Sequence, residues 1–383
     1  MNVYNKINND TLYSNIERLH AEEPLLHRSD YNRDRDRIMH SVAFRRLAHK
    51  TQVFTSDKGD HYRNRLTHSL EVSQIARSLN LFIGGNESLT EAIALSHDLG
   101  HPPFGHAGED MLNELMYDSH GFDHNIQTFR IVTSIEKRYA NFNGLNLTLD
   151  TLEGILKHNG RIDIKTIKNK FFYLKLEDKT KINILSQPSL ESQIASISDD
   201  IAYNCHDLDD GIRAGFFTID NLKNINLINK ILDENIVKFG KMDSNIITNE
   251  LIRSLINNLI HDVVDESIRR IKKFNINKYV EIKSAEDLVV SFSDNLKNDI
   301  IQIKSFLYEN MYKNKNVLVS ANYGKNVLEN LFIFYTNNPK LLPVNWQNEP
   351  GGSVKDNNRL VCDFIACMTD TFAIKQFNKM LNK

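Results

Sequence analysis

The feature that most constrains the fold is the scarcity of residues that interrupt helices. Only seven prolines and sixteen glycines punctuate the 383 residues, and a chain with so few breakers favours long helices. Apolar residues recur at intervals of three and four, as at Val72, Ile75 and Leu79, which is the spacing of a helix with one buried face. The sequence therefore predicts a mainly α-helical protein.

Local start and stop signals place several of these helices. Thr90 is interpreted as the N-cap of a helix that Gly100 ends, because threonine favours helix starts and glycine favours helix ends. Asp123 is a second candidate N-cap, and Pro188-Ser189 marks the start of a long helix.

Two segments depart from the helical pattern. Residues 145–149 alternate briefly between apolar and polar side chains, as a strand would, and residues 161–187 are rich in lysine. We interpret the lysine-rich segment as an exposed insertion or a weak hairpin. The fold class expected is therefore mainly α, with at most a minor β-hairpin.

The balance of charges excludes some classes of protein. Forty-seven basic and 49 acidic side chains give a formal net charge of −2, which argues against a protein that coats a polyanion but leaves a local basic groove open. The segment RDRDR at 33–37 alternates in sign, and such alternation predicts ion pairs on a solvated helix face.

Hydropathy and cysteine usage indicate where the protein works. No apolar run reaches the roughly 18 residues of a membrane span, and the first residues lack the apolar core of a signal peptide. The three cysteines, Cys205, Cys362 and Cys367, form no C-x-x-C pair and suit neither a structural zinc site nor a disulfide framework. We therefore expect no membrane partner and a cytoplasmic location.

Two histidines and two aspartates together suggest a site for a divalent metal. His68 shares a helix face with the apolar stripe, and Asp199 lies near the middle of the long helix. His97 and Asp98 are adjacent, and adjacent side chains on a helix diverge by about 100°, so both reach one ion only near a helix end. Each residue alone is most simply a satisfied polar group. Together they supply two imidazoles and two carboxylates, which suit a divalent ion with open positions.

The order of His68, His97-Asp98 and Asp199 resembles that of the HD superfamily of metal-dependent phosphohydrolases. The most specific matching segments are HDLGHPPFGHAGED at 97–110 and SLESQIASISDDIAYNCHDLDDGIRAG at 189–215. Other segments match between residues 28 and 215, and a weaker match lies near 363–370. These segments are similar to bacterial deoxynucleoside triphosphate triphosphohydrolases, the dGTPase and dGTPase-like proteins.

The resemblance implies both an architecture and an activity. An HD-domain helical bundle would occupy residues 1–218, with the HD motifs spanning 64–210, and a helical carboxyl-terminal half, 219–383, would pack on it. The implied reaction converts a deoxynucleoside triphosphate (dNTP) to deoxynucleoside and inorganic tripolyphosphate. The implied cofactor is one divalent ion per subunit, among Mn²⁺, Mg²⁺, Fe²⁺, Co²⁺ and Ni²⁺, held by His68, His97, Asp98 and Asp199.

The resemblance also implies roles for further residues. His106, Glu109 and His124 would be catalytic, with Glu109 three residues after His106 so that its carboxylate orients and charges that imidazole. His124 would contact the phosphates and protonate the 5′ oxygen, which suits a histidine because its pKa lies near neutrality.

Substrate-binding roles fall on both sides of the HD pair. Arg65, one helical turn before His68, would contact phosphate, and Gln52 would reach the sugar. Tyr203 would pack on the deoxyribose and Asp207 would bind its 3′ hydroxyl. Asp200 departs from the pattern, because some relatives carry a lysine or arginine there that contacts phosphate.

Two alternatives and two partner questions stay open from the sequence. The chain is alternatively an HD phosphohydrolase of another nucleotide, a monophosphate or a cyclic one, or a nucleotide sensor or single-stranded nucleic-acid binder with little turnover. Beyond its dNTP substrate, the resemblance implies a homo-oligomer, from dimer to hexamer, and admits single-stranded nucleic acid as a regulator.

Overall fold

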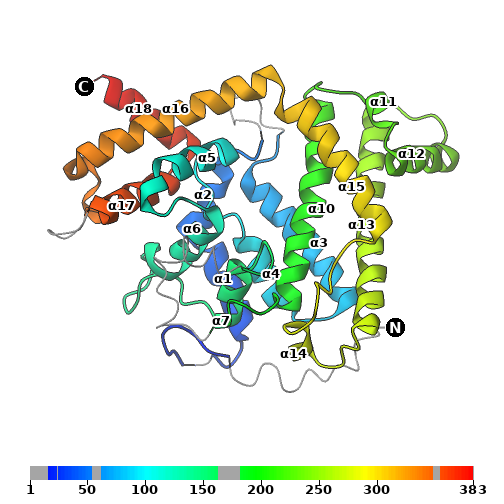
Figure 1. Cartoon of the computed structure of the whole chain (residues 1–383), viewed down its shortest axis with the longest axis horizontal. Coiled ribbons are helices and arrows are strands. Elements are labelled where there is room, and N and C mark those ends of the chain that lie inside the picture. Colours follow the sequence, from blue (N-terminus) through cyan, green and yellow to red (C-terminus); the bar gives the residue numbers. More distant parts are fainter. Residues whose placement is uncertain (1–15, 24, 54–61, 163–181, 348–353, 383) are drawn as a thin grey trace. The chain divides into compact units, whose positions relative to one another are not determined.

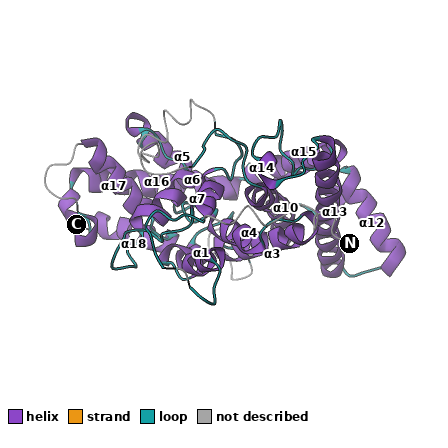
Figure 2. Ribbon diagram, turned by 90° about the horizontal axis from the view of Figure 1, so that it is seen from below, coloured by secondary structure: helices purple, strands orange, loops and turns teal. Residues whose placement is uncertain are grey.

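Helices dominate the described part of the chain. The computed structural model describes residues 16–23, 25–53, 62–162, 182–347 and 354–382. Within these ranges no strand is formed, and only isolated β-bridges occur (Figure 2). The predicted mainly α fold class is therefore confirmed. The described helices also include none that is long and apolar enough to cross a bilayer.

Figure 1 shows the order of the elements along the chain. The first half contains α1 (Asp30–Met39), α2 (Val42–Arg46), α3 (Arg65–Ile83), α4 (Glu87–Ser96), α5 (Gly105–Leu115), α6 (His124–Arg130), α7 (Leu149–Leu156) and α10 (Leu190–Arg213). The second half contains α11 (Ile219–Leu222), α12 (Asn226–Phe239), α13 (Ser244–Lys273), α14 (Tyr279–Ile282), α15 (Asp294–Leu307), α16 (Lys315–Asn337), α17 (Val354–Ala366) and α18 (Asp370–Leu381). Short π-helical turns continue α6 at Ile131–Ile135 and α15 at Tyr308–Tyr312.

Side-chain caps begin two of the helices that matter for function, as the sequence predicts. The Asp123 carboxylate accepts hydrogen bonds from the backbone N–H groups of Asn125 and Ile126 at the start of α6. The Ser189 hydroxyl accepts one from Ser192 at the start of α10. Both caps satisfy donors that the first helical turn leaves without an intrahelical partner.

The expected cap at Thr90 is wrong. The helix α4 begins three residues earlier, and the Asn86 side chain accepts the hydrogen bond from the backbone of Leu89. Thr90 lies within the helix, and its hydroxyl is buried against the Asn80 side chain, 3.0 Å away. Asparagine is as good an N-cap as threonine, so the sequence contains two possible starts for this helix. The burial of Thr90 inside the helix leaves Asn86 as the cap.

The strand-like alternation at 145–149 does not produce a strand. Thr148 instead caps α7 by accepting a hydrogen bond from Thr151, and its backbone forms one isolated bridge with Arg18. Most of the segment predicted as an insertion or weak hairpin, 163–181, lies outside the described residues.

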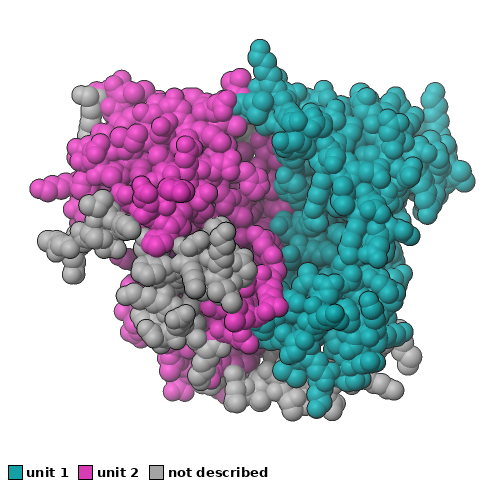
Figure 3. Space-filling model, in the orientation of Figure 1, with its two compact units in different colours: residues 1–15, 70–94, 186–318 teal, residues 16–69, 95–185, 319–383 magenta. Residues whose placement is uncertain are grey.

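The chain divides into two compact units, coloured separately in Figure 3. Unit 1 comprises residues 1–15, 70–94 and 186–318, and unit 2 comprises residues 16–69, 95–185 and 319–383. Both units draw on distant parts of the chain. This division differs from the predicted boundary at residue 218, which stays a prediction.

In unit 1 the long helix α10 is the central support. It packs against α13 and α15, and the first two turns of α10 are fixed by polar contacts at one end. The buried Glu191 carboxylate accepts a hydrogen bond from the Tyr279 hydroxyl. The Gln193 side chain accepts hydrogen bonds from the backbone of Val289 and Val290, at 2.8 and 3.0 Å. These contacts hold the start of α10, the helix that carries Asp199, in place.

In unit 2 a hydrophobic core joins the segment after the HD pair to the end of the chain. Side chains of α5 and its flanking turns, among them Phe104 and Leu112, pack with Leu328, Leu331 and Ile365 from α16 and α17. The two groups of residues that form this core are more than 200 residues apart in sequence, so no local sequence pattern shows their contact.

The charge run at 33–37 forms ion pairs, but its expected solvation is wrong for two of its members. Asp34 is fully buried, where Arg18 and the Thr148 and Thr151 hydroxyls bind its carboxylate. Arg37 is also buried and pairs with Glu22 at 2.8 Å. Buried charges persist when they are fully paired and hydrogen-bonded. Asp34 and Arg37 therefore form ion pairs with distant parts of the chain and do not face the solvent.

Candidate active site

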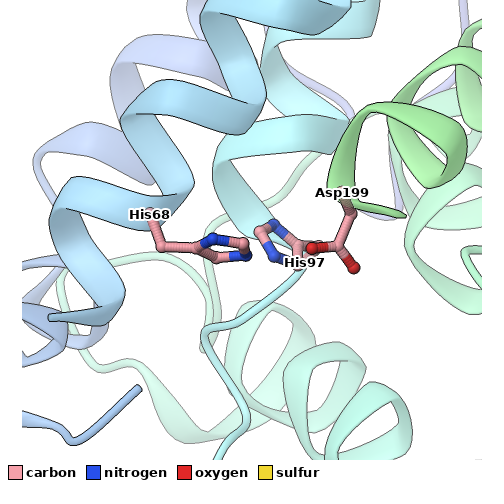
Figure 4. A group of neighbouring side chains, drawn as sticks. All are labelled: His68, His97 and Asp199. Atoms are coloured by element: carbon pink, nitrogen blue, oxygen red, sulfur yellow. The ribbon is translucent and has the colours of Figure 1, made fainter. Parts of the chain in front are cut away.

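Two buried imidazoles lie close together in unit 2. His68, in the first turn of α3, is 2 % exposed, and His97, just beyond the end of α4, is 3 % exposed. Their ring centroids are 5.5 Å apart in an edge-to-face arrangement (Figure 4). Because histidine nitrogens are the commonest metal ligands in proteins, this pair offers the nitrogen half of the predicted metal set.

The turn that carries His97 and Asp98 is held by α6. The Gly100 N–H donates to the Thr128 hydroxyl at 2.8 Å, and that hydroxyl donates to the His97 carbonyl at 3.2 Å. A Cβ on Gly100 would lie only 2.1 Å from the His124 carbonyl, so only glycine fits this close approach. The helix ends at Ser96, earlier than Gly100, which places both predicted ligands in the turn.

Asp98 lies among three cationic or imidazole side chains. Its Oδ2 accepts a hydrogen bond from Arg65 Nη1 at 2.9 Å. Its Oδ1 lies 3.5 Å from His97 Nε2 and 3.4 Å from His101 Nε2. The carboxylate is thus shared between the guanidinium and the imidazoles, and the guanidinium holds its orientation.

Arg65 has unused hydrogen-bonding capacity. The residue is 2 % exposed, and its Nε and Nη2 atoms are buried and bind no acceptor among the described residues. A buried guanidinium with two spare donors is costly unless an anion supplies acceptors. Gly105 leaves room beside it, since a Cβ there would lie 3.3 Å from Arg65 Nη2. This arrangement suits a phosphate contact.

Glu109 connects the two predicted catalytic histidines and favours His124. Its Oε1 accepts hydrogen bonds from the His124 backbone N–H at 3.0 Å and from His124 Nδ1 at 2.8 Å. Its Oε2 lies 3.6 Å from His106 Nδ1 and 3.9 Å from His101 Nδ1. His106 is largely exposed, whereas His124 is mostly enclosed. The sequence paired Glu109 with His106, and the geometry places His124 closer.

The electrostatics of this group separate its members. Burial opposes the ionisation of Glu109, but hydrogen bonds from His106 and His124 outweigh it and hold the pKa of Glu109 well below its usual range. Burial also acts to lower the pKa of His124, yet the Glu109 carboxylate reverses this and raises it. Burial and the neighbouring Arg65 lower the pKa of His101 well below its usual range. The Glu109 carboxylate therefore favours the protonated form of His124, while burial favours the neutral form of His101.

Sequence reasoning did not assign roles to His101 and His158. The His101 ring stacks on His124 with centroids 3.9 Å apart, and the His158 ring stacks on His97 with centroids 5.2 Å apart. His101, His106 and Glu109 also present ligand atoms within 4.8 Å of one another. His101 lies in the matching segment HDLGHPPFGHAGED, and His158 lies in a further segment that resembles the family, LTLDTLEGILKHNG at 147–160. Their position in these segments was the sequence feature that could have identified them.

The remaining predicted residue of unit 2 is Gln52. Its side-chain Oε1 is buried and accepts no hydrogen bond among the described residues. It follows Thr51, whose backbone forms an isolated bridge with Asn64 at the start of α3. The amide is therefore held next to the helix that carries Arg65 and His68.

Unit 1 carries one predicted oxygen ligand and two predicted sugar-binding residues on one helix. Asp199 (labelled in Figure 4), Tyr203 and Asp207 follow one another at intervals of four residues within α10. The Tyr312 hydroxyl donates a hydrogen bond to the Asp207 carboxylate, and the Tyr203 and Tyr312 rings stack with centroids 6.3 Å apart. Burial and the Asp207 charge raise the pKa of Tyr312, so it stays a hydroxyl donor. Tyr312 carried no sequence signal.

Asp200, the departure from the family pattern, is paired within unit 1. Its carboxylate lies 2.6 Å from Lys304 Nζ on α15, and it accepts a hydrogen bond from Asn204 at 3.2 Å. Both side chains of the ion pair are partly exposed.

Comparisons with known proteins cover most of the chain and agree with one another. Residues 65–204 match the HD domain family, and residues 290–379 match the family described as a phosphohydrolase-associated domain. Proteins named deoxyguanosinetriphosphate triphosphohydrolase-like protein are similar to this chain. The one from Bartonella henselae is 43% identical over 93% of this chain and 90% of its own, and the one from Pelagibacter ubique is 44% identical over 97% and 98%. These matches support a hydrolase.

Proposed function

The chain belongs to the family of deoxyguanosinetriphosphate triphosphohydrolase-like HD-domain proteins, and from this premise we propose that it hydrolyses a dNTP with the help of a divalent metal. The reaction adds water across the bond between the α-phosphorus and the 5′ oxygen. The hydroxyl goes to phosphorus and the proton to the 5′ oxygen, so deoxynucleoside and inorganic tripolyphosphate are released. The observation that carries the proposal is the Glu109–His124 pair in the same unit as the buried His68–His97 pair.

The donor set fits a metal. His68 and His97 would supply nitrogen atoms, and Asp98 and Asp199 would supply carboxylate oxygens. Two imidazoles and two carboxylates suit Mn²⁺, Fe²⁺, Co²⁺, Ni²⁺ or Mg²⁺ better than a closed zinc site. When bound, the ion polarises a phosphoryl oxygen and lowers the pKa of bound water.

The chain's own residues would handle the charge and the proton. The spare donors of Arg65 would bind phosphate oxygens. His124, whose protonated form is favoured by Glu109, would deliver the proton to the departing 5′ oxygen. His106, which is exposed and near the same carboxylate, would approach the α-phosphate from the solvent side.

Recognition of the deoxynucleoside would fall to α10 and Gln52. Tyr203 would pack on the sugar and leave no room for a 2′ hydroxyl, while Asp207 would accept a hydrogen bond from the 3′ hydroxyl. Tyr312 supports this role because its hydroxyl already fixes the Asp207 carboxylate. The buried Gln52 oxygen would accept a further bond from the sugar.

One assay tests the proposal. The purified protein, loaded with Mn²⁺ or Mg²⁺, is incubated with each of the four dNTPs singly and in mixtures, and both tripolyphosphate and deoxynucleoside are measured. We expect equal amounts of the two products. Release of monophosphate or pyrophosphate would contradict the proposed bond. Nucleotide binding without turnover would favour the sensor alternative, and parallel assays with added single-stranded DNA test regulation. Oligomeric state and cytoplasmic location stay predictions.

A further inference from the structure

A buried carboxylate near the end of the chain contacts two segments that flank the candidate active site. Asp370, in the first turn of α18, is 3 % exposed. Its Oδ1 accepts a hydrogen bond from the Phe104 backbone N–H at 3.0 Å. Its Oδ2 accepts hydrogen bonds from the Thr51 backbone N–H, at 2.9 Å, and from the Thr51 hydroxyl. One side chain therefore fixes the residue before Gln52 and the residue before α5.

A buried lysine makes a second connection between the same parts. Lys50 is 2 % exposed, and its ammonium group donates to the His101 carbonyl and, at 2.9 Å, to the Ala366 carbonyl at the end of α17. The Lys50 carbonyl in turn accepts a hydrogen bond from the Arg65 backbone N–H at 3.3 Å. All of these residues belong to unit 2.

The turn that these contacts hold has an unfavourable backbone conformation. Phe104 has φ of 65° and lies in the left-handed region, which is unfavourable for a residue other than glycine. Such a conformation persists only where its surroundings fix it. Here the Asp370 carboxylate binds its N–H, and its ring packs where Gly324 of α16 has no side chain, since a Cβ there would lie 2.6 Å from the ring.

The geometry of this turn determines where the catalytic side chains point. Phe104 directly precedes α5, whose first turns carry His106 and Glu109. A rotation at Phe104 would swing both side chains. Misplacement of about 1 Å by a change remote from the chemistry is enough to cost about 10²-fold in rate.

We propose that Asp370 and Lys50 are positioning residues for the hydrolysis, through which α17 and α18 hold Gln52 and the start of α5 in their working arrangement. This assignment rests on the proposed function for its kinetic consequence. It gives the carboxyl-terminal segment a specific task, because Ala366 and Asp370 lie within the part of the chain that matches the phosphohydrolase-associated domain.

The test is Asp370→Asn, with Asp363→Asn as the matched control. The asparagine is isosteric, but either orientation of its amide turns an NH₂ group toward donors of Phe104 or Thr51. Asp363, on α17, is equally buried and binds Arg130 through both oxygens, without touching either flanking segment. We expect kcat of Asp370→Asn to fall roughly 10- to 100-fold with metal content retained and KM little changed. The control should lose stability but stay within about threefold of wild-type kcat in the folded state.

Hydrogen exchange separates this proposal from the proposed function. The Thr51 and Phe104 amides should exchange faster in Asp370→Asn than in Asp363→Asn at matched global stability, whatever the substrate. Unchanged exchange at both amides, or wild-type kcat in Asp370→Asn, would overturn the positioning role. A wild-type protein that hydrolyses no dNTP would instead sink the proposed function and leave the exchange result standing.

A milder pair of variants covers the case in which Asp370→Asn does not fold. Thr51→Val removes one hydroxyl donor to Asp370 and nearly keeps the side-chain volume, while Thr51→Ser keeps the donor. Thr51→Val should lower kcat several-fold and Thr51→Ser should not. Equal activity of these two variants would also count against the proposal.

Discussion

The two units differ in the charged side chains that they bring together: imidazoles in unit 2 and carboxylates in unit 1. Unit 2 gathers imidazoles, among them His68, His97 and His124, so closely that they cannot all be charged. Unit 1 places carboxylates along α10, at Asp199 and Asp207. Unit 2 balances its histidines with Glu109 and by keeping His101 neutral. In unit 1 the Asp207 carboxylate accepts a hydrogen bond from a tyrosine hydroxyl. Under the proposed function, the residues of unit 2 would handle the phosphates and the proton, and α10 of unit 1 would supply one metal ligand and recognise the sugar.

The largest effect should follow from removing a nitrogen ligand of unit 2. His97→Ala should abolish metal binding and turnover together, because it removes one of the four proposed ligands. Metal content per chain and tripolyphosphate release are measured on the same samples. His27→Ala, which changes an exposed histidine, is the control and should match wild type in both. Full metal content and activity in His97→Ala would remove the assignment.

The next effect concerns the proton carried by His124. Glu109 raises the pKa of His124 against the effect of burial, so the protonated form of His124 persists to higher pH and is lost as the pH rises through that pKa. If that proton is delivered to the substrate, kcat/KM falls on the alkaline side. In Glu109→Gln the carboxylate that raises the pKa of His124 is removed, while burial still lowers it. The decrease in kcat/KM should therefore begin at a lower pH than in the wild type, and above that pH kcat/KM should be roughly 10²-fold or more below the wild-type value.

A double variant decides which histidine Glu109 serves. If Glu109 acts through His124, the losses of Glu109→Gln and His106→Ala should combine. If it acts through His106, the double variant should be barely worse than His106→Ala, because groups that act as a unit are not additive. The shorter contact, 2.8 Å to His124 against 3.6 Å to His106, favours the first result.

A smaller effect should come from the hydroxyl that unit 1 supplies. Tyr312→Phe removes the donor to Asp207 and keeps the ring that stacks on Tyr203. A lost hydrogen bond to a charged group costs about 1.5–3 kcal/mol, so KM should rise about tenfold or more while metal content stays constant. Tyr308→Phe, which changes an exposed tyrosine on the same π-helical turn, is the control. An unchanged KM would contradict the proposed role of Asp207 in binding the sugar.

The smallest effect is expected at Asp200. Its ion pair with Lys304 is partly exposed on both sides, and such pairs contribute about 0–1 kcal/mol. Urea unfolding of Asp200→Asn should therefore show a free energy of unfolding within about 1 kcal/mol of wild type. Glu309→Gln, which breaks the exposed pair with Lys313, provides a comparison. A much larger loss at Asp200 would mean that the pair is more enclosed than its exposure indicates.

Local signals in the sequence predicted the parts of the fold that are decided locally. Asp123 and Ser189 cap helices as expected, because a cap depends on neighbours two or three residues away. Thr90 was misassigned because Asn86 competes for the same role and burial chose between them. The burial of Asp34 depends on Arg18 and Thr148, which no pattern within residues 33–37 reveals.

The residues of the candidate site also divide into those that local segments predict and those that only the tertiary fold reveals. His68, His97, Glu109 and His124 were found because they lie in recognisable segments, and the structure brings these four into unit 2. Tyr312 and Asp370 contact the site's residues only through the tertiary fold, about 105 and 266 residues from their partners Asp207 and Phe104. Spacing cannot show such pairs, since the intervening chain can place them anywhere.

The missing side chain at Gly324 has a genetic consequence. Because the Phe104 ring occupies the space of a Cβ at that position, even alanine would push on the turn that begins α5. Mutations at codon 324 should therefore appear among spontaneous loss-of-function alleles, although the codon lies far from the HD pair in the gene. Suppressors of such alleles should remove the Phe104 Cβ and Cγ that the added side chain would meet, as Phe104→Gly does, and would restore activity without altering any residue that meets the substrate.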